Sequence, residues 1–176
     1  MKKLVVFQID NQRFALPLPV VERVVQVVEI FPLPKMSDYV HGIINLHGKI
    51  IPVINMRFLF GLPAKEIELS NQLIIAITPS GKLALLVDST HEVFEFDDDK
   101  IVKSDNIMYG MRYVQGVIKT DDGVVLINDV GKFLDPEELK RLENALKESS
   151  KKPDPESYQD QNVKSQEQPN KPETKM

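Results

Sequence analysis

The chain has 176 residues, of which 42% are hydrophobic and 27% are charged, with no cysteine, no tryptophan and a formal net charge of −4. This composition is typical of one globular domain, and the lack of cysteine excludes a disulfide scaffold, a cysteine nucleophile and thiolate-bound metal sites. The mildly acidic balance, without a basic stripe, argues against a nucleic-acid partner, because binding phosphates requires clustered Lys and Arg.

The amino terminus joins a basic start to a short apolar run, as a secretory signal does. Gln8 and Asp10 interrupt that run, whereas an export signal needs roughly 7–15 apolar residues and a small-residue cleavage site. No later stretch approaches the roughly 18 consecutive apolar residues of a membrane span. We therefore expect a cytoplasmic protein with no direct membrane insertion.

The body of the chain favours β-strands, because its short apolar runs are rich in Val and Ile and are bounded by turn residues. Short helical turns are expected near 55–59 and 128–133. Pro52 has no amide hydrogen, so its strand is expected to be an edge strand or to carry a bulge there. The expected strands cover 3–9, 13–17, 24–30, 43–47, 50–54, 72–78, 82–88, 91–96, 114–119 and 124–127.

An internal repeat relates two parts of this body. The segments 4–7 and 39–44 match 73–76 and 113–118, and an apolar run in each copy then reaches Asn55 or Asn128. The alignment requires a two-residue shortening of the second hairpin. A unit of about 60 residues is marginally stable alone. We therefore expect an all-β protein with two five-stranded β-barrel subdomains, about 4–60 and 73–134, that share one apolar core.

A helix is expected over 136–148, after the second copy. Asp135 is placed as its N-cap, Pro136 at N1 and Glu138 at N3, which supplies acceptors for the unpaired amides of the first turn. Leucines at helical spacing predict that one face docks on the body. These are Leu139, Leu142 and Leu146.

The final segment, 149–176, is nearly devoid of apolar residues. Such a segment buries too little surface to offset the entropy of ordering, so we predict that it is disordered. A neutral tether is the favoured interpretation, and a short partner motif within it is the alternative.

Candidate catalytic chemistry is sparse. The histidines are His41, His47 and His91, and the sequence has no His-Glu-x-x-His helix, phosphate loop or nucleophile elbow. The run 97–99 lacks the spacing of a calcium loop, so we interpret it as a solvated turn. A hydrolytic metal site built from these groups ranks below a binding function, and we predict no enzymatic activity and no cofactor. Four carboxylates are interpreted as solvated: Glu92, Glu95, Glu137 and Glu138.

The segment 42–55 differs in kind from its neighbours. It joins a polar hairpin tip at His47 and Gly48 to apolar flanks and to a strand weakened by Pro52. Such a hairpin suits protein recognition by a strand edge or a groove. A core hairpin with an ordinary turn explains the same residues equally well.

At these residues the sequence resembles the CheW family of coupling proteins of bacterial chemosensory systems. The family motif begins with Gly-[Val/Ile]-Ile-Asn-Leu-Arg-Gly. One variable residue and two Ile or Val residues follow, and the motif ends with Pro-Val-Ile-Asp-Leu-Arg. Weaker similarity extends over about 3–147. The matching positions are Gly42, Ile43, Ile44, Asn45, Leu46, Gly48, Pro52, Val53, Ile54 and Arg57.

The resemblance implies a non-catalytic adaptor that links the cytoplasmic tip of methyl-accepting chemoreceptors to the regulatory domain of a CheA-type histidine kinase. It also implies two five-stranded barrels within a CheW-like domain over 1–148. The partner-binding residues that follow from it are Gly42, Asn45, Leu46, His47, Gly48 and Arg57.

Two positions depart from the family motif. His47 stands where the family has arginine. An imidazole, which titrates at about pH 6.5 when unperturbed, therefore replaces a guanidinium that is always charged. Asn55 replaces the usual aspartate. Because the matching arginine is associated with receptor coupling, a divergent CheW-like module that regulates a kinase in a non-chemoreceptor pathway is the alternative function.

Overall fold

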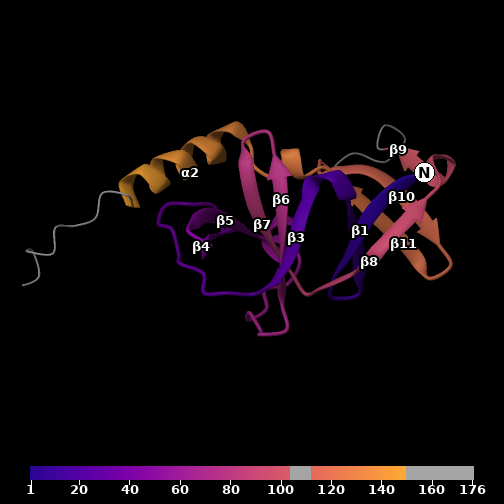
Figure 1. Cartoon of the computed structure of the whole chain (residues 1–176), viewed down its shortest axis with the longest axis horizontal. Helices are drawn as coiled ribbons and strands as arrows, with labels where there is room; N and C mark the ends of the chain where they lie inside the picture. Colours follow the sequence, from indigo (N-terminus) through magenta and orange to yellow (C-terminus); the bar gives the residue numbers. More distant parts are fainter. Residues whose placement is uncertain (104–111, 150–176) are drawn as a thin grey trace, which may run out of the picture.

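The structure is a computed structural model that describes residues 1–103 and 112–149. Its strands form two sheets that lie side by side along the long axis, and the C-terminal helix runs along the outside of the five-stranded sheet (Figure 1). The strands are β1 (Lys2–Ile9), β2 (Gln12–Pro17), β3 (Val21–Gln26), β4 (Val40–Leu46), β5 (Lys49–Asn55), β6 (Gln72–Thr78), β7 (Gly81–Val87), β8 (Ser89–Phe96), β9 (Ile101–Lys103), β10 (Val114–Thr120) and β11 (Gly123–Asn128). The helical segments are α1 (Met56–Leu59), α2 (Pro136–Ser149) and the 3-10 turns η1 (Leu18–Val20), η2 (Asp98–Lys100) and η4 (Val130–Lys132).

The predicted fold class, an all-β protein of two repeated five-stranded units and a C-terminal helix, is confirmed, with one strand more in the second unit. The strand order is β3-β6-β7-β5-β4 in one sheet and β8-β1-β2-β11-β10-β9 in the other. The second sheet has six strands because β9, which was not predicted, pairs with β10. Its three residues are too few to show an alternating pattern of their own.

Each sheet takes strands from both copies of the repeat. β1 and β2 join β8 to β11, whereas β3 to β5 join β6 and β7. The sheets therefore do not coincide with the predicted division into 4–60 and 73–134. The exchange is fixed by two parallel pairings, β5 with β7 and β11 with β2, which bring the end of each hairpin beside a strand of the other copy.

The two sheets nevertheless have the same register. Positions that are related by the repeat pair in the same way in each sheet. The corresponding pairs are Val24 with Ile74 and Val93 with Val5, and Val53 with Ala84 and Ile127 with Ala15.

The structure corrects the alignment of the two hairpins. In both, the paired strand ends enclose a two-residue turn, so the second hairpin is not shorter. The backbone amides of Asn55 and Asp129 make the same contact, because each donates to the tyrosine that precedes β4 or β10, at 2.8 Å. The counterpart of Asn55 is therefore Asp129 rather than Asn128.

The largest buried cluster joins the two sheets. It contains Phe7 and Phe14 from the six-stranded sheet, Ile74 and Leu85 from the five-stranded sheet, and Phe133 after η4. Two smaller clusters lie within the individual sheets. Burying these side chains together supplies the hydrophobic stabilisation that a single copy lacks, and the predicted shared core is confirmed.

β5 is an interior strand, contrary to the expectation that Pro52 marks an edge. β4 pairs with one side of β5 and β7 with the other, but the ladder to β7 begins only at Val53. The missing amide of Pro52 therefore lies beyond the ladder and costs no hydrogen bond there. The bulge of this hairpin lies instead on β4, between Val40 and Gly42.

α2 docks as predicted. The Glu138 backbone amide donates to the Asp135 side chain at 2.8 Å, which is the expected N-cap. Leu142 is buried, and its neighbours on the same helix face, Leu139 and Leu146, are half-buried. None of the helices within 1–103 and 112–149 has the length and apolarity needed to cross a membrane.

Glu138 is buried, which corrects its interpretation as a solvated carboxylate. Its carboxylate oxygens accept hydrogen bonds from the Ser37 backbone amide and hydroxyl, both at 2.8 Å. Burial raises the pKa of nearby Tyr39 to about 12, and the charge of Glu138 adds to the effect. The predicted disordered tail, 149–176, lies outside the described residues except for Ser149, which ends α2.

Candidate functional site

The β4–β5 hairpin carries five of the six candidate partner-binding residues. Its turn consists of His47 and Gly48, with φ angles of 52° and 81°. Positive φ at both turn residues matches the twist of a hairpin, and glycine adopts it without a steric penalty. The Asn45 side-chain oxygen accepts a hydrogen bond from the Gly48 amide at 2.9 Å, so the tip is held in one conformation.

The hairpin tip is accessible. The His47 side chain is exposed, and no hydrogen bond or ion pair within the described parts of the chain engages its ring. Leu46 packs partly against the core of its sheet, whereas Ile50 on the opposite strand is 50% exposed. The tip therefore presents an imidazole beside apolar surface, which is a composition suited to a protein interface.

Gly42 has a structural role inside the hairpin. A Cβ atom at this position would lie 2.2 Å from the Phe31 carbonyl oxygen, and the φ angle is 155°. Phe31 and Ile43 exchange backbone hydrogen bonds, both at 2.8 Å. Glycine is therefore required for the close approach of the segment before β4, and not for a contact with solvent or a partner.

Arg57 lies at the opposite end of β5 from the hairpin tip. It is 7% exposed, and its guanidinium donates to both carboxylate oxygens of Asp10, at 2.8 and 3.0 Å, and to Asp88 at 2.7 Å. We refer to Arg57, Asp10 and Asp88 as the arginine clamp. The structure thus does not bring Arg57 together with the other candidate residues.

The arginine clamp connects the two sheets. Asp10 lies in the turn between β1 and β2 of the six-stranded sheet, whereas Asp88 lies between β7 and β8, where the chain leaves the five-stranded sheet. The hydrogen bond from Arg57 lowers the pKa of Asp10, and the same bond raises the pKa of Arg57. The clamp residues are 31 and 47 positions apart, so no local pattern could have identified them.

The other polar candidates are the run 97–99 and the remaining histidines. Within residues 1–103 and 112–149, no group of three or more His, Cys, Asp or Glu residues is placed to hold a metal ion. The run 97–99 is exposed and leads into η2, as expected of a solvated turn. The His91 ring lies 3.1 Å from the Gln8 side-chain oxygen.

Comparison with known proteins places the chain among similar sequences and folds. The CheW-like domain model matches residues 3–138. The chain is 29% identical over 130 residues to chemotaxis protein CheW of Thermotoga maritima, covering 73% of this chain and 85% of that protein. It is 26% identical over 148 residues to chemotaxis protein CheW of Treponema pallidum, covering 81% of this chain and 87% of that protein.

A solved structure shows the same fold. The crystal structure of scaffolding protein TtCheW from Thermoanaerobacter tengcongensis matches with a TM-score of 0.71 and 32% sequence identity. The match covers 78% of this chain and 94% of that chain. The family match, residues 3–138, covers the β4–β5 hairpin and strands of both sheets.

Proposed function

The chain belongs to the CheW-like domain family, and from that membership we propose that it is a non-catalytic adaptor that links chemoreceptors to a CheA-type histidine kinase. The family match over 3–138, which leaves no described strand unaccounted for, carries this proposal. An adaptor requires preformed surfaces and no reactive groups, in agreement with a rigid hairpin tip. The proposed role places the protein in the cytoplasm.

Within this function, the tip of the β4–β5 hairpin is the proposed partner contact. Asn45, His47 and Gly48 form a turn that is already ordered, so little conformational entropy is lost on binding. Leu46 and Ile50 add apolar area beside it. Arg57 and Gly42 support the contact by holding the hairpin in place. The proposed partners are the regulatory domain of the kinase and the cytoplasmic tip of the receptor.

The experiment that tests this contact is His47→Glu. Introducing a carboxylate at the tip should weaken binding to a kinase regulatory domain or a receptor-tip fragment several-fold, because charge repulsion and desolvation act only in the complex. Binding is measured by titration calorimetry at one salt concentration, since exposed charges respond to screening. Unchanged thermal unfolding of the variant shows that folding is intact.

Two further variants make the experiment specific. Lys119→Gln makes the same change of charge at an exposed residue of β10, close to the turn of the other hairpin, so it measures the effect of net charge alone. His47→Arg restores the residue of the family motif and should be tolerated or strengthen receptor binding through a planar donor fork. Equal affinities for parent, His47→Glu and His47→Arg would remove His47 from the interface.

A second candidate function is favoured by His47 itself. With imidazole in place of the family's arginine, the chain is suited to regulate a kinase in a pathway without chemoreceptors. A pull-down from extract of the source cells distinguishes the two functions. Recovery of both a chemoreceptor and a histidine kinase supports the first, and recovery of a kinase without a chemoreceptor supports the second.

A further inference from the structure

The internal repeat is broken at the arginine clamp. Gly131 lies 74 positions after Arg57, the shift that relates the two hairpins, so glycine stands at the counterpart of the arginine. Both carboxylates are also replaced in the other copy. By the 69-residue shift that relates the remaining strands, the counterparts of Asp10 and Asp88 are Pro79 and Pro19.

Glycine in place of arginine at position 131 leaves space. Beside the Arg57 guanidinium the remaining cavity measures about 10 Å³. Around Gly131 and Pro79, by contrast, a groove of about 390 Å³ is open between η4, the β6–β7 turn and α2. A groove of this size accommodates a long side chain, whereas the space beside Arg57 accommodates nothing further.

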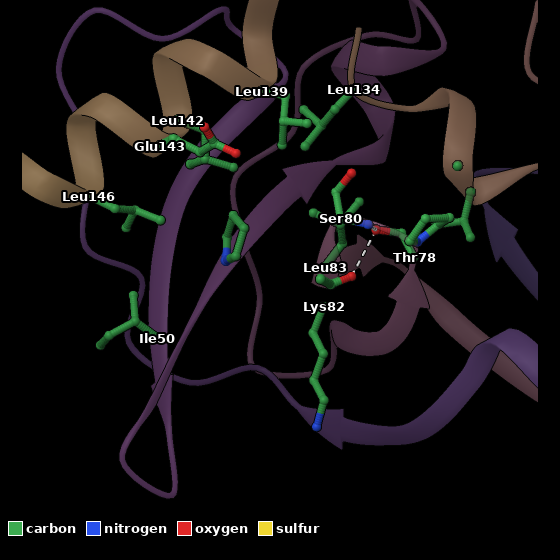
Figure 2. A pocket seen from close by; sticks show the side chains of 15 residues that line it. Ile50, Thr78, Ser80, Lys82, Leu83, Leu134, Leu139, Leu142, Glu143 and Leu146 are labelled. Atoms are coloured by element: carbon green, nitrogen blue, oxygen red, sulfur yellow. Dashed lines mark hydrogen bonds between the residues drawn. The ribbon is translucent and has the colours of Figure 1, made fainter. Parts of the chain in front are cut away.

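The walls of the groove are mainly apolar, as Figure 2 shows for the labelled residues. α2 forms one wall with its leucine face, and β5 and β7 form the other. The lining residues with apolar side chains include Leu139, Leu142, Leu146, Ile50, Pro52 and Leu83. An open apolar wall of this kind is stabilised when a partner's methylene groups cover it.

The groove contains one carboxylate that is not compensated. Glu143 lines it from α2 with an exposed side chain, which has no ion pair or hydrogen bond within residues 1–103 and 112–149. The lysine in the lining, Lys82, is paired with Glu22 at 2.8 Å. The groove therefore combines an apolar wall with one unpaired negative charge.

We propose that this groove receives an arginine side chain from a partner protein. The methylene stem would lie against the leucine face of α2, with the guanidinium at Glu143. Arginine fits both features, because its apolar stem can cover the leucine face while its charged head stays at the exposed rim beside Glu143. Arg57 fills the equivalent position in the first copy, so the fold accommodates this side chain at the corresponding place.

A peptide titration tests the proposal. The probe is the acetylated, amidated peptide Ala-Leu-Arg-Leu-Ala, compared with the same peptide carrying norleucine in place of arginine. Titrated into methyl-labelled full-length protein, the arginine peptide should shift the signals of Leu139, Leu142 and Leu146 and bind several-fold more tightly than the norleucine peptide. Equal affinity of the two peptides, or shifts confined to other residues, would overturn the proposal.

Substitutions on α2 test the role of the carboxylate. Glu143→Gln should weaken binding of the arginine peptide several-fold and leave the norleucine peptide unaffected. Glu148→Gln removes the same charge from an exposed position of α2 that does not line the groove, so it should change neither affinity. An equal effect of both substitutions would attribute the binding to net charge and would contradict the site.

Filling the groove provides an independent test. At Gly131 a Cβ atom would meet one neighbour, the Asp129 side-chain oxygen, at 3.2 Å, so a side chain can be added with a small adjustment. Gly131→Arg should abolish the peptide-induced shifts while the circular dichroism spectrum is unchanged. Persistent binding to a folded Gly131→Arg variant would overturn the proposal, and if that variant fails to fold, Glu143→Gln decides. No kinase or receptor is used, so a negative result leaves the adaptor function standing.

Discussion

The two hairpins, β4–β5 and β10–β11, have the same register but different surroundings. The first ends at Arg57 in the arginine clamp, whereas the second ends at Gly131 beside an open groove that has α2 as one wall. The backbone pairings repeat because both sheets must bury apolar strands against the shared core. Side chains at the ends of the strands are not constrained in this way, so they differ between the copies.

The second copy makes different contacts at this place. Instead of ion pairs it has α2, which packs through the buried Leu142 and accepts hydrogen bonds from Ser37 at the Glu138 carboxylate. The first copy thus has an ion-paired arginine that the second lacks, and the second has a docked helix that the first lacks. Ion pairs and apolar burial respond differently to mutation and to pH.

The largest effect is expected at Leu142, which has no counterpart in the first copy. Leu142→Ala should lower the free energy of unfolding by about 2–5 kcal/mol, because it removes a buried side chain and leaves a cavity. Urea unfolding measures the change. Leu69→Ala is the control, since Leu69 is 88% exposed and should change stability by less than about 0.5 kcal/mol. Similar losses in both variants would show that α2 is not docked through Leu142.

The next largest loss of stability is expected at Gly42, and it can be compared with the loss at Gly116, the same position of the other hairpin. Gly42→Ala should cost about 3 kcal/mol, because the added methyl meets a backbone oxygen and the φ angle is unfavourable. Gly116→Ala should cost less, about 1 kcal/mol, because the nearest backbone atom to an added Cβ, the Val102 carbonyl oxygen, lies at 3.3 Å and its φ angle is not positive, although the Ile101 Cγ2 methyl at 2.8 Å must shift. Denaturant unfolding checks the order, and a larger loss for Gly116→Ala would contradict the comparison.

Much of the fold could be predicted from the sequence because its signals are local. Short apolar runs bounded by turn residues identified ten strands, and the Asp135 cap located the start of α2. The exchange of strands between the copies could not be predicted, since either arrangement buries the same apolar faces. β9 was missed because three residues carry no periodicity.

Part of the geometry of the candidate hairpin could be predicted for the same reason, whereas its role in binding stays a prediction. The turn at His47 and Gly48 follows from local chemistry and lies on the surface as expected. The positions of Arg57 and Glu138 depend on contacts with residues that are distant in the sequence, Asp10 and Ser37. A single sequence contains no signal for such contacts, so Glu138 was wrongly interpreted as solvated and Arg57 was grouped with the tip.

A smaller effect is expected from removing the guanidinium of the clamp. Arg57→Met keeps most of the apolar stem but removes the hydrogen bonds to Asp10 and Asp88, and it should cost about 2 kcal/mol. At the equivalent position, Gly131→Ala should change stability by less than about 0.5 kcal/mol, because that residue is exposed. Unfolding in urea measures both. Equal effects would show that the clamp adds nothing to the first copy.

The smallest expected effect is a pH dependence of the stability that Asp10 contributes, and it concerns the first copy alone. The hydrogen bond from Arg57 lowers the folded-state pKa of Asp10 below its ordinary value of 3.8. A carboxyl group with a lowered folded pKa contributes stability that is present above its unfolded pKa and is lost as the pH falls through the folded pKa. Asp10→Asn should therefore be less stable than the parent near neutral pH, and the difference should shrink below about pH 4.

The double variant identifies the source of this pH dependence. If the guanidinium is responsible, Asp10→Asn should have no effect on stability in the Arg57→Met background at any pH, because the partner is already absent. Urea unfolding of the four proteins between about pH 3 and about pH 7 measures the coupling between the two residues. A difference between parent and Asp10→Asn that is the same at every pH would show that Asp10 acts through its turn conformation, with φ of 51°, and not through its charge.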